Sequence, residues 1–164
     1  MLTDSKQTSV EIADLIDYPS ALETVVSWID TQWASFSGRS LEETRARYTD
    51  GIIRDQLPIT LIALSGDEIL GLASLRERDS FDFLPGKTPW ICNVYVDQKA
   101  RGKGIAGALC KGLEKRANLL GYTEMFLATV MHHNSLYHRL GFKEVAQVEA
   151  HGDLTAVLCK EIER

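Results

Sequence analysis

The hydrophobic pattern of the chain changes period several times, which separates expected helices from expected strands. Apolar residues spaced three or four apart follow Pro19, and the same spacing recurs after Arg101, as in amphipathic helices. Ser40 followed by Glu43 is the spacing of a capping box and indicates a second, shorter helix. The expected helices run from Pro19 to the break at Ser37-Gly38, from Ser40 to about Tyr48, from about Arg101 to Leu120 before Gly121, and from Asn134 or Ser135 to Gly141.

Short apolar or alternating runs bounded by turn residues predict strands in the remaining stretches. Ser65-Gly66-Asp67 connects two of them as a hairpin, and His151-Gly152-Asp153 connects the last two. The expected strands cover residues 8–16, 59–64, 69–78, 90–96, 124–128, 142–149 and 154–161. The order β-α-α-β-β-β-α-β-α-β-β predicts a mixed α/β fold without repeats or linkers. We expect one domain over residues 1–164, with residues 1–7 as a flexible N-terminus.

Composition and charge narrow the class of protein. The chain is 45% hydrophobic and 25% charged, and it has no apolar run near the roughly 20 residues that span a bilayer. The net charge of −5 argues against a nucleic-acid partner. A negative surface permits a cationic substrate such as an amine, but the same charge is also that of an ordinary soluble protein. Cys92, Cys110 and Cys159 lie in apolar surroundings, as reduced thiols do, and the N-terminus has no secretion signal, so we expect a cytoplasmic protein.

A glycine-rich loop, Arg101-Gly102-Lys103-Gly104-Ile105-Ala106, lies between a buried strand and the long helix. Its two glycines allow several backbone N–H groups to point at one anion, and the helix start adds the positive end of its dipole. No acid follows until Glu114, so two cations lie where helices usually carry acids. A bound phosphate would offset that cost. The alternative is a plain turn with solvated cations.

The same stretch also matches a dinucleotide-binding fingerprint through Gly102, Gly104 and Gly107. That interpretation fits poorly, because five residues separate Val96 from Gly102 and no acid ends the next strand, at Val130. The nucleoside-triphosphate motif G-x-x-x-x-G-K-[S/T] is absent from the sequence. Both nucleotide interpretations remain minor alternatives.

A second block contains Asn134 and the pattern Tyr137-x-x-x-Gly141-Phe142. By itself it is an amphipathic helical turn. The earlier block consists of the strand residues Val94-Tyr95-Val96 and the loop 101–106, and the loop fits the pattern [Q/R]-x-x-G-x-[G/A]. Together, the two blocks resemble the GCN5-related N-acetyltransferase (GNAT) superfamily. The resemblance covers about residues 90–142. It implies a central, mostly antiparallel twisted sheet of six to seven strands with about four helices, and two middle strands splayed around the cofactor.

The resemblance also implies a cosubstrate, acetyl-CoA, and the residues that hold it. The amides of loop 101–106 would bind the pyrophosphate. The main chain of Val94, Tyr95 and Val96 would pair with the pantetheine arm, and Asn134 would hydrogen-bond the arm from the other side. Tyr137 resembles the family's general acid; a phenol, with a pKa near 10, is protonated at neutral pH and can donate to the departing thiolate. The alternative is that Tyr137 only packs beside the cofactor.

Several residues are candidates for the general base and for the walls of the acceptor pocket. We expect a primary amine on a small molecule or peptide, with Glu77, Asp79, His132, His133 or water as the general base. By analogy, Trp33 and Phe36 would form one pocket wall, and Phe81, Phe83 and Trp90 the other, whereas Trp28 would pack in the core. No metal is expected, since His132-His133 lacks matching ligands. The rival hypotheses are a non-catalytic acyl-CoA sensor and an enzyme for longer acyl chains. Many relatives in this superfamily dimerise, so the resemblance also allows a homodimer.

Overall fold

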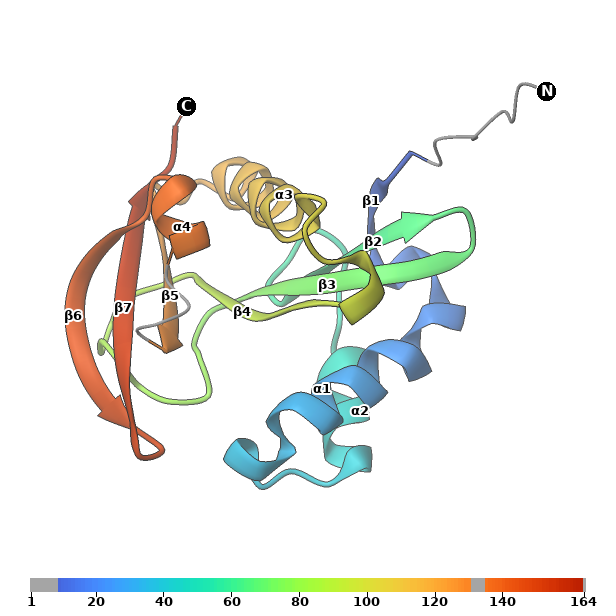
Figure 1. Cartoon of the computed structure of the whole chain (residues 1–164), viewed down its shortest axis with the longest axis horizontal. Helices are drawn as coiled ribbons and strands as arrows, with labels where there is room; N and C mark the ends of the chain where they lie inside the picture. Colours follow the sequence, from blue (N-terminus) through green and yellow to red (C-terminus); the bar gives the residue numbers. More distant parts are fainter. Residues whose placement is uncertain (1–8, 131–134, 164) are drawn as a thin grey trace.

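The structure, a computed structural model that describes residues 9–130 and 135–163, is built on one seven-stranded sheet (Figure 1). The strand order is β1-β2-β3-β4-β5-β7-β6, and all neighbours are antiparallel except β4 and β5, which are parallel. The strands are β1 Glu11–Asp14, β2 Ile59–Ser65, β3 Glu68–Arg76, β4 Trp90–Val96, β5 Glu124–Val130, β6 Lys143–Ala150 and β7 Asp153–Glu161. The predicted mixed, mostly antiparallel sheet is confirmed.

The described helices are α1 Leu22–Ser37, α2 Leu41–Thr49, α3 Ile105–Leu119 and α4 Ser135–Arg139. The predicted capping box is confirmed at the start of α2, where the Glu43 N–H donates to Ser40 Oγ at 3.1 Å. In return, the Ser40 N–H donates to Glu43 Oε2 at 2.8 Å. Gly38 ends α1 in the left-handed conformation, at φ +68°.

Several expected boundaries differ from those observed. The first strand covers only Glu11–Asp14, because Leu15 turns into the core under α1 and two short 3-10 turns, Leu15–Asp17 and Pro19–Ala21, follow. The third strand ends at Arg76 rather than residue 78. Leu120, expected on the apolar stripe of α3, is exposed because the helix ends at Leu119.

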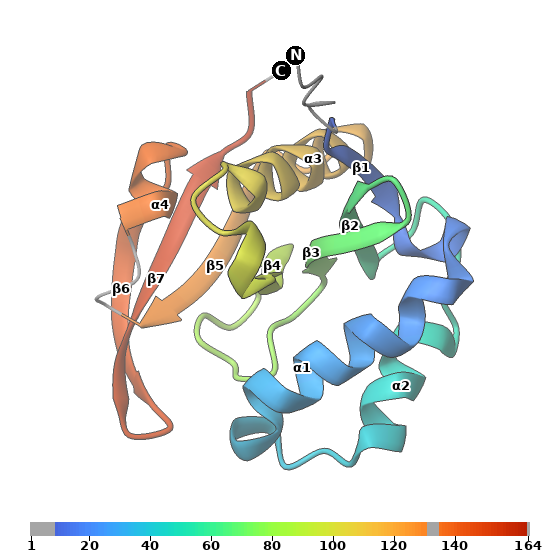
Figure 2. The same ribbon diagram turned by 45° about the vertical axis from the view of Figure 1, so that its right-hand side comes forward.

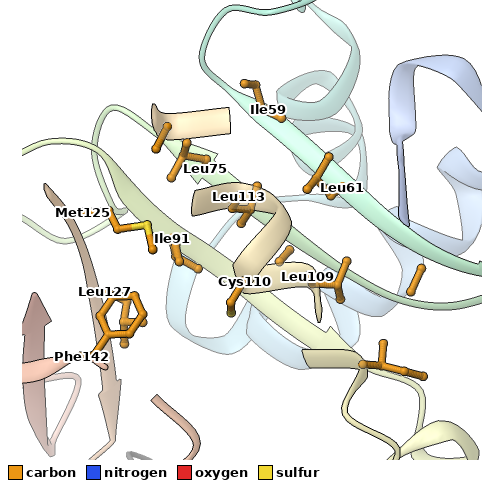
Figure 3. Close-up of a cluster of buried hydrophobic side chains, with 14 of the residues drawn as sticks. Ile59, Leu61, Leu75, Ile91, Leu109, Cys110, Leu113, Met125, Leu127 and Phe142 are labelled. Carbon is orange, nitrogen blue, oxygen red and sulfur yellow. The ribbon is translucent and has the colours of Figure 1, made fainter. Parts of the chain in front are cut away.

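The helices bury opposite faces of the sheet. In the main core, α3 packs on one face, where Leu109 and Leu113 meet Leu61, Leu75 and Ile91 of the strands (Figure 3). On the other face, α1 and α2 cover β2 and β3 (Figure 2). A third cluster is formed by side chains of β4, β5 and β7, and the β3–β4 loop packs against it. Its strand residues are Trp90, Cys92, Phe126 and Val157, and the loop contributes Phe83 and Leu84. The sheet is thus a two-sided scaffold with β4 in its middle.

β4 and β5 pair only at their beginnings. The register joins Trp90 to Phe126 and Ile91 to Leu127, and beyond these pairs the two strands diverge (Figure 1). On the other edge of β4, the pairing with β3 contains a bulge after Cys92. The sheet is therefore split on the carboxyl-terminal side of this parallel pair, and the split positions the site.

Candidate functional site

A cleft of about 540 Å³ opens where β4 and β5 diverge. Its inner end is lined by Asn93 and Val94 of β4, by residues 127–130 of β5 and by Tyr137 of α4. Its outer end lies between α1, α2, the β3–β4 loop and the β6–β7 turn. One continuous cleft therefore connects the split in the sheet with a pocket beneath the early helices.

The side chains of β4 are engaged in packing on both faces of the sheet. Val94 and Val96 pack against the main core under α3. Tyr95 points the other way and packs on Trp28 and Trp33, with ring centroids 5.2 Å and 6.5 Å away. Beyond Ile91, no described residue of β5 pairs with β4. The strand therefore presents main-chain N–H and C=O groups, rather than side chains, to the split.

The bulge in β4 is held by a contact with α2. Asn93 adopts φ +54°, which is uncommon for a residue other than glycine. The Tyr48 hydroxyl donates to Asn93 Oδ1 at 3.0 Å, and Tyr48 itself is buried. This bond fixes the backbone immediately before Val94, which lines the cleft.

The glycine-rich loop has the form expected of an anion site. Gly102 and Gly104 take φ +78° and +77°, and a Cβ on either residue would meet nothing within 4 Å. Gly104 is the residue before α3, so no side chain caps the helix, and its first turn contains no acid. Arg101 folds back, donating from Nε to the Val96 carbonyl at 2.9 Å. The space in front of the helix start is open, and the dipole there favours a negative charge.

Tyr137 projects from α4 into the cleft and is partly buried, with its ring 6.2 Å from that of Phe142. Burial raises the pKa of the Tyr137 phenol well above its usual value near 10. The hydroxyl is therefore a proton donor throughout the neutral range. Asn134, His132 and His133 lie outside the described residues.

Of the two carboxylates considered as a base, only Asp79 lines the cleft; Glu77 is exposed and does not line it. Burial raises the pKa of Asp79, and the Ser80 N–H donates to its Oδ1 at 2.6 Å. His151, in the β6–β7 turn, also lines the cleft. Its sequence context is that of an ordinary hairpin turn, so only the fold indicates it.

Aromatic side chains form the outer walls. Trp33, Phe36, Phe81 and Phe83 line the cleft, as expected, and Trp28 packs in the core. The expectation for Trp90 is wrong: the ring is buried against Phe126, 5.4 Å away, and does not reach the cleft. The ring of His151 lies 5.7 Å from that of Phe36 and 5.9 Å from that of Phe81, so it connects the two walls.

The thiols near the site are unsuited to nucleophilic attack. Burial raises the pKa of Cys110 to about 12 and also raises the pKa of Cys92, so both thiols stay protonated. In residues 9–130 and 135–163, no three His, Cys, Asp or Glu side chains gather as metal ligands. No helix within those ranges has the length and apolarity needed to cross a bilayer.

The fold is that of solved acetyltransferases. An aminoglycoside 6'-N-acetyltransferase complexed with coenzyme A is 13% identical and has a TM-score of 0.74 over 94% of this chain and 98% of its own. An N-acetyltransferase from Staphylococcus aureus Mu50 is 17% identical, with a TM-score of 0.73 over 94% and 99%. Arabidopsis thaliana NAA60 in complex with acetyl-CoA is also 17% identical, with a TM-score of 0.70 over 94% and 99%.

The sequence agrees with this class. The model of the acetyltransferase (GNAT) family matches residues 23–142, and the chain belongs to that family. No curated protein matches it. The match extends from α1 to the end of the Tyr137–Phe142 block, so it includes the split strand, the glycine-rich loop and most residues of the cleft. The part of the cleft formed around the β6–β7 turn lies beyond the match.

Proposed function

We propose that this protein is an N-acetyltransferase that transfers the acetyl group of acetyl-CoA directly to a primary amine of a small molecule or peptide. The observation that carries the proposal is the single cleft that runs from the split between β4 and β5, past Tyr137, to the aromatic pocket. The thioester and the amine can approach each other in that cleft from opposite ends. The family assignment and the fold shared with coenzyme A-bound enzymes support it.

Acetyl-CoA would be held mainly by backbone groups. The N–H groups of Arg101, Gly102, Lys103, Gly104, Ile105 and Ala106 are assigned to the pyrophosphate. The open space around Gly102 and Gly104 and the acid-free helix start fit a doubly charged group there. Val94, Tyr95 and Val96 are assigned to the pantetheine arm through the unpaired edge of β4. Asn134 is assigned to the same arm on the family resemblance.

The chemistry follows from the groups that line the cleft. The neutral amine attacks the thioester carbonyl carbon; a C–N bond forms, and the C–S bond breaks. The Val94 N–H is assigned to the developing oxyanion, because the bulge at Asn93 fixes that stretch of backbone. Tyr137 donates its proton to the departing thiolate. Burial, which raises its pKa, keeps the phenol protonated until that step but also makes it a weaker acid, so the proton moves only as the negative charge develops on sulfur.

Asp79 is the proposed base. It is the carboxylate among the sequence candidates that lines the cleft, and its raised pKa makes it a better proton acceptor than an ordinary aspartate. It would take the proton that the amine loses, either directly or through water. The proton given by Tyr137 and the proton taken by Asp79 balance over one turnover.

The test is release of the CoA thiol from acetyl-CoA with a panel of amines, for the wild type and Tyr137→Phe. We expect amine-dependent release that falls by about 10²-fold or more in the variant, with unchanged acetyl-CoA binding, as for loss of a general acid. Tyr122→Phe is the matched control, because Tyr122 packs on the main core and does not line the cleft. Acetyl-CoA binding without thiol release from any amine would contradict transfer and favour a sensor domain.

A further inference from the structure

Three arginines lie together at the acceptor end of the cleft. Arg39, between α1 and α2, and Arg47, on α2, line it directly. Arg76, at the end of β3, lies behind Tyr48, with its guanidinium carbon 5.0 Å from the centre of the Tyr48 ring. From this cluster, and resting on the proposed function, we infer that the acceptor amine carries a carboxylate, which Arg47 and Arg39 bind while Arg76 reinforces the positive field.

The three arginines differ from others in the chain in what they contact. Arg45, Arg54 and Arg116 each form an ion pair with a carboxylate. Within the part of the chain that the structure describes, Arg39, Arg47 and Arg76 have no carboxylate within 4 Å. Among the described residues, the Arg39 guanidinium has one hydrogen bond, which Nη1 donates to the Ser80 hydroxyl at 3.5 Å. Ion pairs thus satisfy Arg45, Arg54 and Arg116, whereas the three arginines at the cleft have none. Arg78, Arg101 and Arg139 also form no ion pair among the described residues, but they are exposed to solvent and do not line the cleft.

Arg76 is the buried member of the cluster and gives the strongest support for an anion nearby. Its residue is 9% exposed, and its Nε and Nη2 atoms are buried without a hydrogen-bond partner among the described residues. A buried guanidinium without a carboxylate is destabilising, and folding alone does not explain its presence. A substrate anion bound nearby would compensate part of that cost.

The acids of the cleft offset only part of the cluster's charge. Asp79 is the acid that faces the cluster: burial, the largest influence, raises its pKa, while the charges of Arg47 and Arg76 lower it. One carboxylate does not balance three guanidinium groups, and Asp153 is exposed in the β6–β7 turn. Burial, followed by the charges of Arg76 and Arg39, lowers the pKa of Arg47. The cations therefore repel one another at this wall, and an arriving anion relieves the repulsion.

The ligand chemistry follows from shape and charge together. A planar guanidinium binds a carboxylate through two parallel N–H···O bonds, which fixes its direction as well as its position. The amine of the same molecule must reach Val94 and Tyr137 at the inner end of the cleft. Trp33, Phe36 and Phe81 line the space between and suit an apolar side chain. An amino acid with an apolar side chain meets all three conditions, whereas a polyamine would meet the repulsion of three arginines.

The experiment compares acceptors that differ only in the carboxylate. Binding to the CoA-saturated protein is measured by calorimetry for phenylalanine and methionine, for their decarboxylated amines, and for spermidine; thiol release from acetyl-CoA is measured in parallel. The variants are Arg47→Gln, Arg47→Lys and Arg39→Gln. Arg45→Gln is the matched control, because Arg45 is on the same helix but outside the cleft and paired with Glu23. Circular dichroism verifies folding.

We expect the amino acids to bind wild type more tightly than their decarboxylated amines, and Arg47→Gln to weaken only the amino acids, by roughly 10- to 100-fold. Arg47→Lys should restore part of the affinity, and Arg45→Gln should change nothing. Equal or tighter binding of the decarboxylated amines, an equal effect of Arg47→Gln on both classes, or no binding of any amino acid would overturn the inference. Arg47-dependent binding of amino acids without thiol release would instead overturn the proposed transfer and leave the carboxylate site standing.

Discussion

Tyr48 donates its hydroxyl hydrogen to Asn93 Oδ1 over 3.0 Å and so connects α2 with the bulge in β4. The two residues are 45 positions apart, yet this bond reaches the residue before Val94, the proposed oxyanion donor. The same tyrosine ring lies against Arg76, whose guanidinium carbon is 5.0 Å from its centre. The acceptor wall and the cofactor strand are therefore coupled through one buried side chain.

Tyr48→Phe tests this coupling. The change removes one hydrogen bond and leaves Asn93 Oδ1 without that donor, so the free energy of unfolding should fall by about 1 kcal/mol. We also expect kcat to fall several-fold, because the bulge before Val94 is held less firmly. Urea denaturation and steady-state kinetics measure the two effects. Tyr122→Phe, at a partly buried tyrosine packed on the main core away from the cleft, is the control. An unchanged kcat in Tyr48→Phe would contradict the coupling.

The features that the sequence predicts correctly are local. The capping box of Ser40 and Glu43 and the glycine-rich loop before α3 depend on residues within a few positions of one another. Their backbone conformation is therefore predictable from the spacing of a few residues. The same holds for the strand Trp90–Val96, whose apolar run reflects burial on two faces.

The features that sequence reasoning missed depend on contacts between distant segments. Arg47 and His151 reach the cleft from elements that look like an ordinary helix and an ordinary turn. Analogy places Trp90 beside the pocket, but the tertiary fold buries it against Phe126. Asn93 has its unusual φ because β4 carries a bulge, which a run of apolar residues does not reveal. Only the assembled sheet and its surrounding loops bring these residues to one place.

Gly104→Ala tests the proposed pyrophosphate loop. At φ +77° a Cβ is strained, so we expect a loss of about 1–2 kcal/mol in unfolding free energy. The added methyl group would also project into the open space before α3, so acetyl-CoA should bind roughly tenfold or more weakly. Calorimetry with acetyl-CoA and thermal denaturation measure both.

Gly66→Ala is the matched control for this change. Gly66 also has a positive φ, +61°, and a Cβ there would meet nothing within 4 Å, but it lies in the turn between β2 and β3, outside the cleft. We expect a similar loss of stability with unchanged acetyl-CoA affinity. Equal affinities for the two variants would show that the loop at Gly104 does not hold the cosubstrate.

Asp79→Asn should separate stability from activity. Burial raises the pKa of Asp79 in the folded protein above its value in the unfolded chain. At a pH between these two pKa values, the folded protein keeps a proton that the unfolded chain has lost. Stability therefore falls as pH rises through that window. Removing the charge should stabilise the protein at neutral pH, and the gain should vanish in acid, below the unfolded value near 3.9.

The same variant should lose about 10²-fold or more in kcat/KM, because the proposed base is gone. Thermal melts at several pH values and thiol-release kinetics provide the measurements. Asp82→Asn, at an exposed aspartate of the same loop outside the cleft, should change neither quantity. A stabilised Asp79→Asn variant with full activity would exclude Asp79 as the base and leave His132, His133, His151 or water to be tested.

Gly71→Ala tests how closely β3 must approach β4. A Cβ at Gly71 would lie 2.7 Å from the Tyr95 carbonyl oxygen, and that atom is backbone, so the strand itself must move. We expect a loss of about 1–3 kcal/mol in unfolding free energy, as for other overpacked sites. Acetyl-CoA should also bind more weakly, because Tyr95 lies on the strand assigned to the pantetheine arm.

Gly112→Ala provides the contrast for Gly71→Ala. Its Cβ would lie 2.9 Å from Leu61 Cδ1, which is the end of a flexible side chain that can rotate away. The strain there is offset by the roughly 0.5–1 kcal/mol that alanine gains over glycine inside a helix, so stability and binding should change little. Denaturation and calorimetry on the two variants distinguish a position that shapes the cofactor strand from one that only packs the core. Equal acetyl-CoA affinities would contradict the first role for Gly71.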